Sequence, residues 1–211
     1  MRVISVNVGK PREVEWRGKM VSTGIYKEPV SGRVAVRSLN LDGDGQADLS
    51  VHGGLDKAVY AYPAEHYDYW LREQPGAPLG WGIFGENLTT DGLHEQNVCV
   101  GDRFRIGTAE LVVTQPRLPC YKLGIRFQDP SIIGRFLASG RTGFYFAVTR
   151  EGEVGEGDPV TRLSEDAQRV SIADFVRLYR GENDDPDLLR RVNAVEAVPE
   201  SWRTWFAQHR S

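Results

Sequence analysis

Cys120 is the residue with the clearest chemical potential, because cationic side chains surround its thiol in the sequence. It follows Leu111–Thr114, a β-branched run that predicts a strand ended by prolines. Arg117, Lys122 and Arg126 favour the thiolate, which is the nucleophilic and metal-binding form of cysteine. We therefore expect Cys120 to react or to bind a metal, close to an anionic ligand.

Positive charge is concentrated around this cysteine. Residues 110–150 carry six Arg or Lys against two acidic residues, whereas the whole chain has a formal net charge of −3. A basic segment within an acidic protein favours a small anionic ligand over a nucleic acid, whose binding proteins usually present a broader basic face. A solvated surface segment is the alternative interpretation.

Two further segments have residue types suited to ligand binding. His52, Gly53, Gly54 and Lys57 combine paired glycines, which let backbone N–H groups approach a ligand, with two side chains that donate or carry charge. The simpler interpretation of this segment is a turn with a capped histidine. Asn87 follows a glycine-containing stretch and is either a ligand contact or a turn residue.

Spacing excludes several common sites. Residues 42–53 have Ala47 where a calcium-binding loop needs glycine, and Gly53 where it needs a bidentate carboxylate. The chain has no Gly-rich phosphate loop and no paired C-x-x-C, and two cysteines cannot hold an iron–sulfur cluster by four thiolates. Cys99 lies between two valines, and we expect it in the core.

The elements that must position these residues are mainly β in the first part of the chain. Alternation at residues 3–8 and recurrent Gly-Asp turns predict short strands of a closed or half-closed barrel. A helix is expected from Pro63, with Tyr67, Trp70 and Leu71 on its buried face.

The pattern changes near residue 165, where three helical segments replace the strands. Ser171 is expected to cap the first of them. The sequence thus predicts a β domain at residues 1–164 and a three-helix domain at 165–211. Residues 171–211 carry six arginines and seven acidic residues, so we expect packing or partner docking here rather than DNA binding.

The expected cellular compartment follows from the absence of long apolar segments and from the number of cysteines. No apolar run reaches the roughly 18 residues of a membrane span, and no basic-then-apolar leader is present. With two cysteines that are 21 positions apart, these features predict a cytoplasmic protein. The aromatic residues Trp202 and Trp205 fill a local core or mediate contacts in a homodimer.

Four sequence blocks together resemble the MOSC domain of YiiM-like proteins, a name that abbreviates molybdenum cofactor sulfurase C-terminal. The resemblance extends over nearly the whole chain and includes the three-helix tail. The blocks lie within Tyr26–Pro29, Gly43–Val59, Phe84–Leu88 and Gln115–Leu123.

The resemblance implies a β-barrel similar to the small domain of pyruvate kinase, with a molybdopterin cofactor whose molybdenum is bound by Cys120. A soft thiolate suits a metal that is already held by a dithiolene. The other cofactor contacts that the resemblance implies are Lys27, His52, Gly53, Gly54, Lys57, Asn87, Arg117 and Lys122.

The resemblance also implies one of two functions. The first is an oxidoreductase that reduces N-hydroxylated compounds such as hydroxylaminopurine-type base analogues, with electrons from an external reductase. The second is a carrier that delivers molybdenum cofactor or sulfur to another enzyme. Sulfurases release sulfur with a pyridoxal-phosphate domain, and none fits into 211 residues, which favours the reductase. A cysteine hydrolase, with His52 as a base for Cys120, is a third interpretation.

Overall fold

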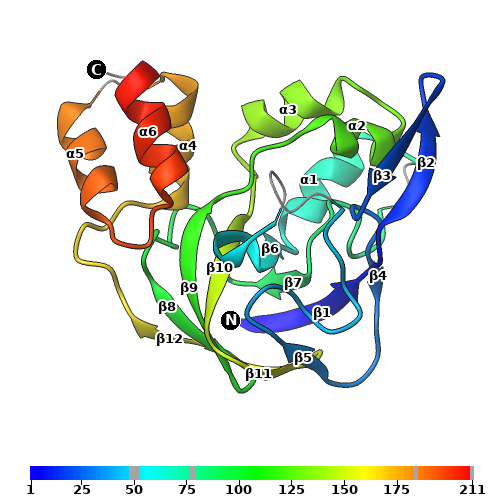
Figure 1. The fold of residues 1–211 in the computed structure, drawn as a ribbon, viewed down its shortest axis with the longest axis horizontal. Coiled ribbons are helices and arrows are strands. Elements are labelled where there is room, and N and C mark those ends of the chain that lie inside the picture. Colours follow the sequence, from blue (N-terminus) through cyan, green and yellow to red (C-terminus); the bar gives the residue numbers. More distant parts are fainter. Residues whose placement is uncertain (48–52, 77–78, 183–184, 210–211) are drawn as a thin grey trace.

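An eight-stranded sheet forms the body of the molecule in the computed structural model, which describes residues 1–47, 53–76, 79–182 and 185–209 (Figure 1). Its strand order is β12-β8-β9-β10-β6-β7-β1-β4, and β6 and β7 are its one parallel pair. Two small sheets, β11-β5 and the hairpin β2-β3, flank it. The strands are β1 (Arg2–Val8), β2 (Arg12–Trp16), β3 (Lys19–Thr23), β4 (Glu28–Pro29), β5 (Val34–Val36), β6 (Val59–Pro63), β7 (Leu88–Asp91), β8 (Arg103–Ile106), β9 (Ala109–Pro116), β10 (Phe144–Arg150), β11 (Gly152–Val154) and β12 (Val160–Ser164).

Backbone hydrogen bonds join strand β1 to the chain that leads into β12, at the far end of the strand order. Val3 N donates to Asp158 O at 2.9 Å, and Val160 N donates to Met1 O at 3.1 Å. The sheet therefore wraps far enough round for two non-neighbouring parts to bond, as a barrel requires. The sheet-rich fold that the sequence predicted is confirmed, whereas full closure of the barrel remains a prediction.

Three helices lie among the strands. The predicted helix starts later than expected, because Pro63 ends β6 and the helix begins at His66. Tyr67 and Trp70 are buried in it, but Leu71 is 49% exposed, so its predicted burial is wrong. None of the helices in the described part of the chain has the length and apolar character needed to cross a bilayer. The three helices are α1 (His66–Glu73), α2 (Tyr121–Phe127) and α3 (Ile132–Ser139).

Three further helices follow the last strand, as the sequence predicted. The first begins where expected, because Ser171 Oγ accepts a hydrogen bond from Asp174 N at 3.0 Å. Phe175 and Phe206 of this segment belong to the same buried apolar core as Val100 and Phe146 of the β part. The division into two domains near residue 165 stays a prediction, since one core runs through both parts. The helices are α4 (Ile172–Arg180), α5 (Pro186–Ala194) and α6 (Glu200–His209).

Candidate functional site

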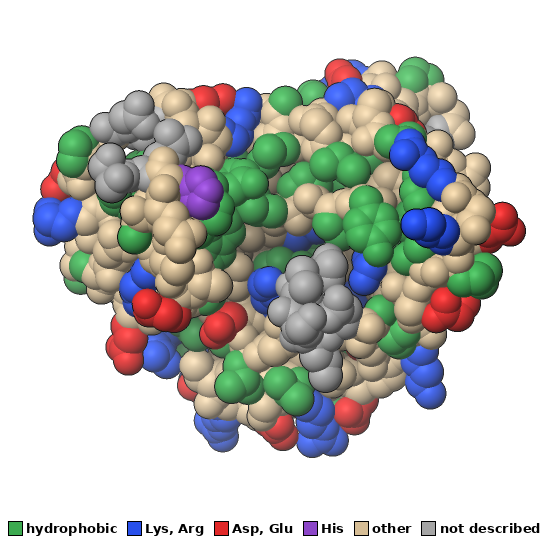
Figure 2. All heavy atoms as spheres, turned by 45° about the horizontal axis from the view of Figure 1, so that its top comes forward, with side chains coloured by type: hydrophobic (Ala, Val, Ile, Leu, Met, Phe, Trp, Pro, Cys, Tyr) green, Lys and Arg blue, Asp and Glu red, His purple; other side chains and the backbone are tan. Residues whose placement is uncertain are grey.

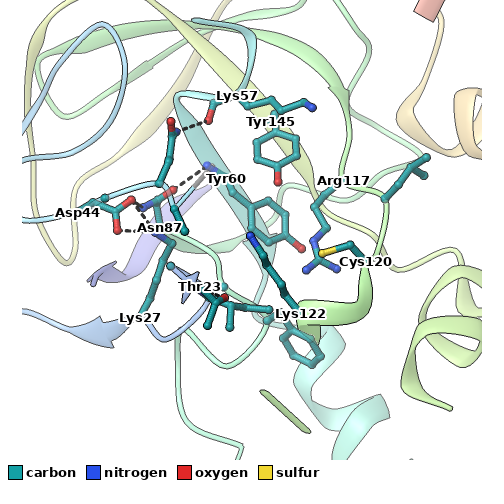
Figure 3. Close-up of a pocket in the computed structure, with 18 residues that line it drawn as sticks. Thr23, Lys27, Asp44, Lys57, Tyr60, Asn87, Arg117, Cys120, Lys122 and Tyr145 are labelled. Atoms are coloured by element: carbon teal, nitrogen blue, oxygen red, sulfur yellow. Dashed lines mark hydrogen bonds and ion pairs between the residues drawn. The ribbon is translucent and has the colours of Figure 1, made fainter. Parts of the chain in front are cut away.

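Segments that are far apart in the sequence meet around one cavity, shown in Figure 3. The connections after β3, before β6, before β7 and after β9 each contribute side chains to its lining. Six of the nine residues that the resemblance implied for the site line this cavity: Lys27, Lys57, Asn87, Arg117, Cys120 and Lys122.

Two of the remaining three, Gly53 and Gly54, are not among the residues that line the cavity. The third, His52, lies outside the described residues. Gly53 and Gly54 precede the short 3-10 helix η1 (Leu55–Lys57), and Gly54 takes a φ of 97°, a conformation that favours glycine. The carbonyl of Gly54 accepts a hydrogen bond from Lys57 N at 3.1 Å. In this structure Gly54 therefore shapes the turn that carries Lys57, and a direct cofactor contact from either glycine stays a prediction.

Cys120 lies between the end of β9 and the first residue of α2. Its side chain is partly exposed, and Figure 3 shows its sulfur directed to the cavity beside the guanidinium of Arg117. The position just past a strand end agrees with the prediction. Cys99, in contrast, is 3% exposed, so its predicted place in the core is confirmed. The two cysteines thus differ in their access to a ligand.

Arg117 is a buried cation with a donor that has no acceptor. Its guanidinium lies over the rings of Tyr60 and Phe136, at 5.6 and 5.1 Å from their centroids. Burial opposes its charge, but interactions with Tyr60, Tyr145 and Cys120 more than offset this, and the pKa of Arg117 is raised. Within the described part of the chain, its Nη1 is buried without a hydrogen-bond partner. Such an atom indicates a missing anionic or carbonyl ligand.

A buried ion pair forms the opposite wall of the cavity. Lys27 pairs with Asp44, and both side chains are less than 10% exposed. Burial lowers the pKa of Lys27, whereas Asp44 opposes this shift. Asn87 Nδ2 donates to Asp44 Oδ2 at 2.8 Å, and its Oδ1 accepts from Tyr60 N at 3.0 Å. Asn87 therefore positions Asp44 and β6, and its contact with a cofactor stays a prediction.

The donor set fits a phosphorylated ligand that carries a thiophilic metal. Among the described lining residues Asp44 is the one carboxylate, against the cations Lys27, Lys57, Arg117 and Lys122. No histidine is among the described residues that line the cavity, and His52, the base that the hydrolase interpretation needs, lies outside them. The described residues contain no group of three or more His, Cys, Asp or Glu that would hold a metal ion. A metal beside Cys120 would therefore need ligands from a cofactor as well.

Tyr145 and Gln46 are among the lining residues that were not found from the sequence. Tyr145 lies on β10 between the buried Phe144 and Phe146, and its half-buried ring faces the cavity. This alternation is a signal that sequence reasoning could have used. Gln46 has its Oε1 buried without a partner in the described chain, while its amide nitrogen donates to Leu39 O and Lys57 O. No local pattern distinguishes it from other loop residues.

Glu86 organises the loop that carries Asn87. The carboxylate is fully buried and accepts hydrogen bonds from Gly82 N at 2.9 Å, Phe84 N at 3.1 Å and Thr89 Oγ1 at 3.0 Å, and also from Tyr67 Oη. Burial raises the pKa of Glu86, and these donors oppose the shift. The loop conformation therefore depends on one acidic side chain.

Replacing Glu86 with alanine is expected to lower the free energy of unfolding by about 3 kcal/mol, because several buried donors lose their acceptor at once. Urea denaturation of Glu86→Ala measures this loss. The matched control is Glu13→Ala, since Glu13 is exposed on β2. Equal stability of Glu86→Ala and the control would contradict the assigned role.

Comparisons with known proteins agree with this architecture. A family model described as "MOSC domain" matches residues 48–161. The uncharacterized protein YflK of Bacillus subtilis is 43% identical, over 97% of this chain and 92% of its own length, and protein YiiM of Escherichia coli is 37% identical, over 89% and 84%. A protein named reductase from Gibberella moniliformis is 33% identical over 89% of this chain, which spans 34% of its length. The crystal structure of YiiM from Geobacillus stearothermophilus has a TM-score of 0.83 at 36% identity, and the match covers 100% of this chain and 99% of that one.

Proposed function

Because this chain belongs to the MOSC domain family and is a YiiM-like member of it, we propose that it is a molybdenum-cofactor-dependent oxidoreductase that reduces N-hydroxylated compounds. Hydroxylaminopurine-type base analogues are the substrates proposed. The relative named a reductase supports an oxidoreductase-like function. The family name itself supports an association with the molybdenum cofactor.

One observation carries the proposal: a partly exposed cysteine lies beside a buried arginine that has a spare donor, in a cavity with three lysines. Cys120 would bind the molybdenum of the cofactor. Arg117 and Lys122 would bind its phosphate, because each brings positive charge to the same side of the cavity in Figure 3. The cofactor, when bound, supplies the two-electron chemistry that these side chains lack.

The reaction breaks the N–O bond of an N-hydroxylated amine. Two electrons from an external donor reductase and two protons are consumed, and the amine and water are released. Lys57 is the proposed proton donor, since burial lowers its pKa below that of an ordinary lysine and so makes its ammonium more acidic. Its neighbour Asp56 opposes this shift. Lys57 lines the cavity together with Cys120, which supports a role for both toward the same bound molecule.

The test is turnover by protein purified from a host that makes molybdopterin. We expect the loaded protein to convert 6-N-hydroxylaminopurine to adenine with a chemical or flavoprotein electron donor, and chromatography of the products measures the conversion. Protein that carries molybdenum but reduces neither this purine nor other N-hydroxylated compounds would overturn the reductase and favour the cofactor carrier. The Cys99→Ala variant, changed at a buried cysteine remote from the lining, is expected to match the wild type.

A further inference from the structure

A groove next to the cavity is lined largely by aromatic and apolar side chains. The reaction proposed above assigns no role to its aromatic side chains. We call it the aromatic groove and define it by Leu118, Cys120, Tyr145, Tyr179, Trp202 and Trp205, which line it with a few neighbours. Tyr179 belongs to α4, and the two tryptophans belong to α6. Figure 2 shows hydrophobic side chains gathered in a hollow between the helices, with Lys or Arg side chains further inside.

The tryptophan wall of this groove is held in a fixed orientation. Trp202 Nε1 donates to Gln115 Oε1 at 2.7 Å, which ties α6 to β9. Trp202 also packs edge-to-face against the buried Phe175, with ring centroids 5.0 Å apart. Trp205 packs against Tyr179 at 5.0 Å. Both tryptophans are nevertheless only partly buried, so this wall presents preformed aromatic surface to a ligand.

The aromatic groove is continuous with the cationic cavity. Lys57, Leu118, Cys120 and Tyr145 line both spaces. The cavity alone measures about 100 Å³, which is less than the roughly 300–1,000 Å³ typical of small-molecule sites, and the groove adds about 380 Å³. A ligand of ordinary size therefore does not fit in the cavity alone and would extend into the groove, with Cys120 among the residues that line both.

The groove also has a definite chemical preference. No carboxylate is found among the side chains that line it in the described structure, and Lys57 is the one cation. The groove thus offers no ion-pair partner to a positively charged ligand, and Lys57 would repel one. Two indole rings and two phenol rings also offer stacking and edge contacts to a flat, uncharged ring.

We propose that the aromatic groove binds the planar heteroaromatic ring of the substrate and directs its N–O group toward Cys120. This assignment rests on the proposed reductase function. It makes the C-terminal helices part of the substrate site, with Tyr179, Trp202 and Trp205 as specificity-determining residues. Flat N-hydroxylated heterocycles are then preferred over aliphatic N-hydroxy compounds, which cannot stack.

The first test measures binding rather than turnover. Adenine, the amine expected from reduction of 6-N-hydroxylaminopurine, is titrated calorimetrically into the purified full-length protein. We expect Trp205→Leu to bind adenine at least about tenfold more weakly than the wild type, and Trp205→Phe to retain most of the affinity. Trp16→Leu is the matched control, because Trp16 lies at the tip of the β2–β3 hairpin and lines neither space.

Folding of each variant is checked by thermal denaturation, so that lost binding is not mistaken for lost structure. Adenine affinity that is equal in wild type, Trp205→Leu and Trp16→Leu would overturn the assignment of the groove. So would a wild-type protein that binds no adenine.

The second test separates the groove from the reductase function. In the loaded enzyme, Trp205→Leu is expected to raise the KM for 6-N-hydroxylaminopurine at least about tenfold with little change in kcat, and to leave the KM for hydroxylamine unchanged. Turnover with an unchanged KM for the purine would overturn the assignment of the groove as the ring-binding site and leave the proposed reductase function intact. Adenine binding that depends on Trp205, in a protein without turnover, would support the groove and overturn the reductase.

Discussion

Replacing Cys120 with alanine is expected to remove molybdenum from the purified protein almost completely. Several cationic side chains line the cavity and could bind the cofactor phosphate. Cys120, however, has the one thiol among the described lining residues. If Cys120 binds the molybdenum as proposed, the variant lacks the bond that would fix the metal to the chain, and the proposed reduction of N-hydroxylated substrates should be lost with it. The measurement is molybdenum per chain by elemental mass spectrometry, on protein from a molybdopterin-making host.

Cys99→Ala is the matched control for this loss. Cys99 is 3% exposed and its N–H donates to Asp102 Oδ2 at 3.1 Å, so its thiol belongs to the core and not to the cavity. We expect Cys99→Ala to retain the wild-type metal content. Equal molybdenum in Cys120→Ala and Cys99→Ala would refute ligation by Cys120.

Replacing Arg117 with methionine is expected to weaken anion binding by about tenfold or more without loss of stability. A hydrogen bond to a charged group contributes about 1.5–3 kcal/mol, which corresponds to at least a tenfold change in affinity. Methionine avoids the desolvation cost of the buried guanidinium, whose Nη1 lacks a partner in the described chain, but it also loses the attraction of the cation to the Tyr60 and Phe136 rings. Because the two changes oppose each other, we expect the cofactor-free variant to resist urea about as well as the wild type.

Two measurements check this expectation: calorimetric titration with inorganic phosphate at low salt, and urea denaturation of the same preparations. Arg150→Met is the control, because Arg150 belongs to the same basic segment but is exposed at the end of β10. A stable Arg117→Met variant with wild-type phosphate affinity would contradict a role in anion binding. A variant that binds less phosphate only because it unfolds would indicate a structural role instead.

The local part of the site could be predicted from the sequence. Arg117, Cys120 and Lys122 lie within six positions after a strand, so the cationic surroundings of the thiol follow from the end of one element. The same reasoning placed Cys99 in the core, since it is flanked by valines on both sides. Local spacing therefore sufficed wherever one segment supplied the residues.

The contacts between distant segments could not be predicted from local spacing, although the family resemblance implied Lys27, Lys57 and Asn87, which line the cavity. Asp44 and Asn87 are hydrogen-bonded across 43 positions, and the residues around Asp44 by themselves suggested a calcium loop that their spacing excludes. The helix α2 was not predicted, because this part of the chain was expected to be β; it contains Gly124, a poor helix former. The structure explains the glycine, because a Cβ there would lie 3.3 Å from the Cα of Pro130. The close approach of Pro130, which follows α2 in the chain, favours glycine at position 124, even though glycine lowers the helix propensity of α2.

The apolar core shared by the sheet and the C-terminal helices bears on how ligands enter and leave. Phe175 and Phe206 are fully buried in that core, so swinging the helices outward as a hinged lid would expose them to water. Trp202, tied to Gln115, would also have to give up its hydrogen bond. We therefore expect these helices to stay packed on the sheet while substrate and product exchange, with no gating motion of theirs in the catalytic cycle.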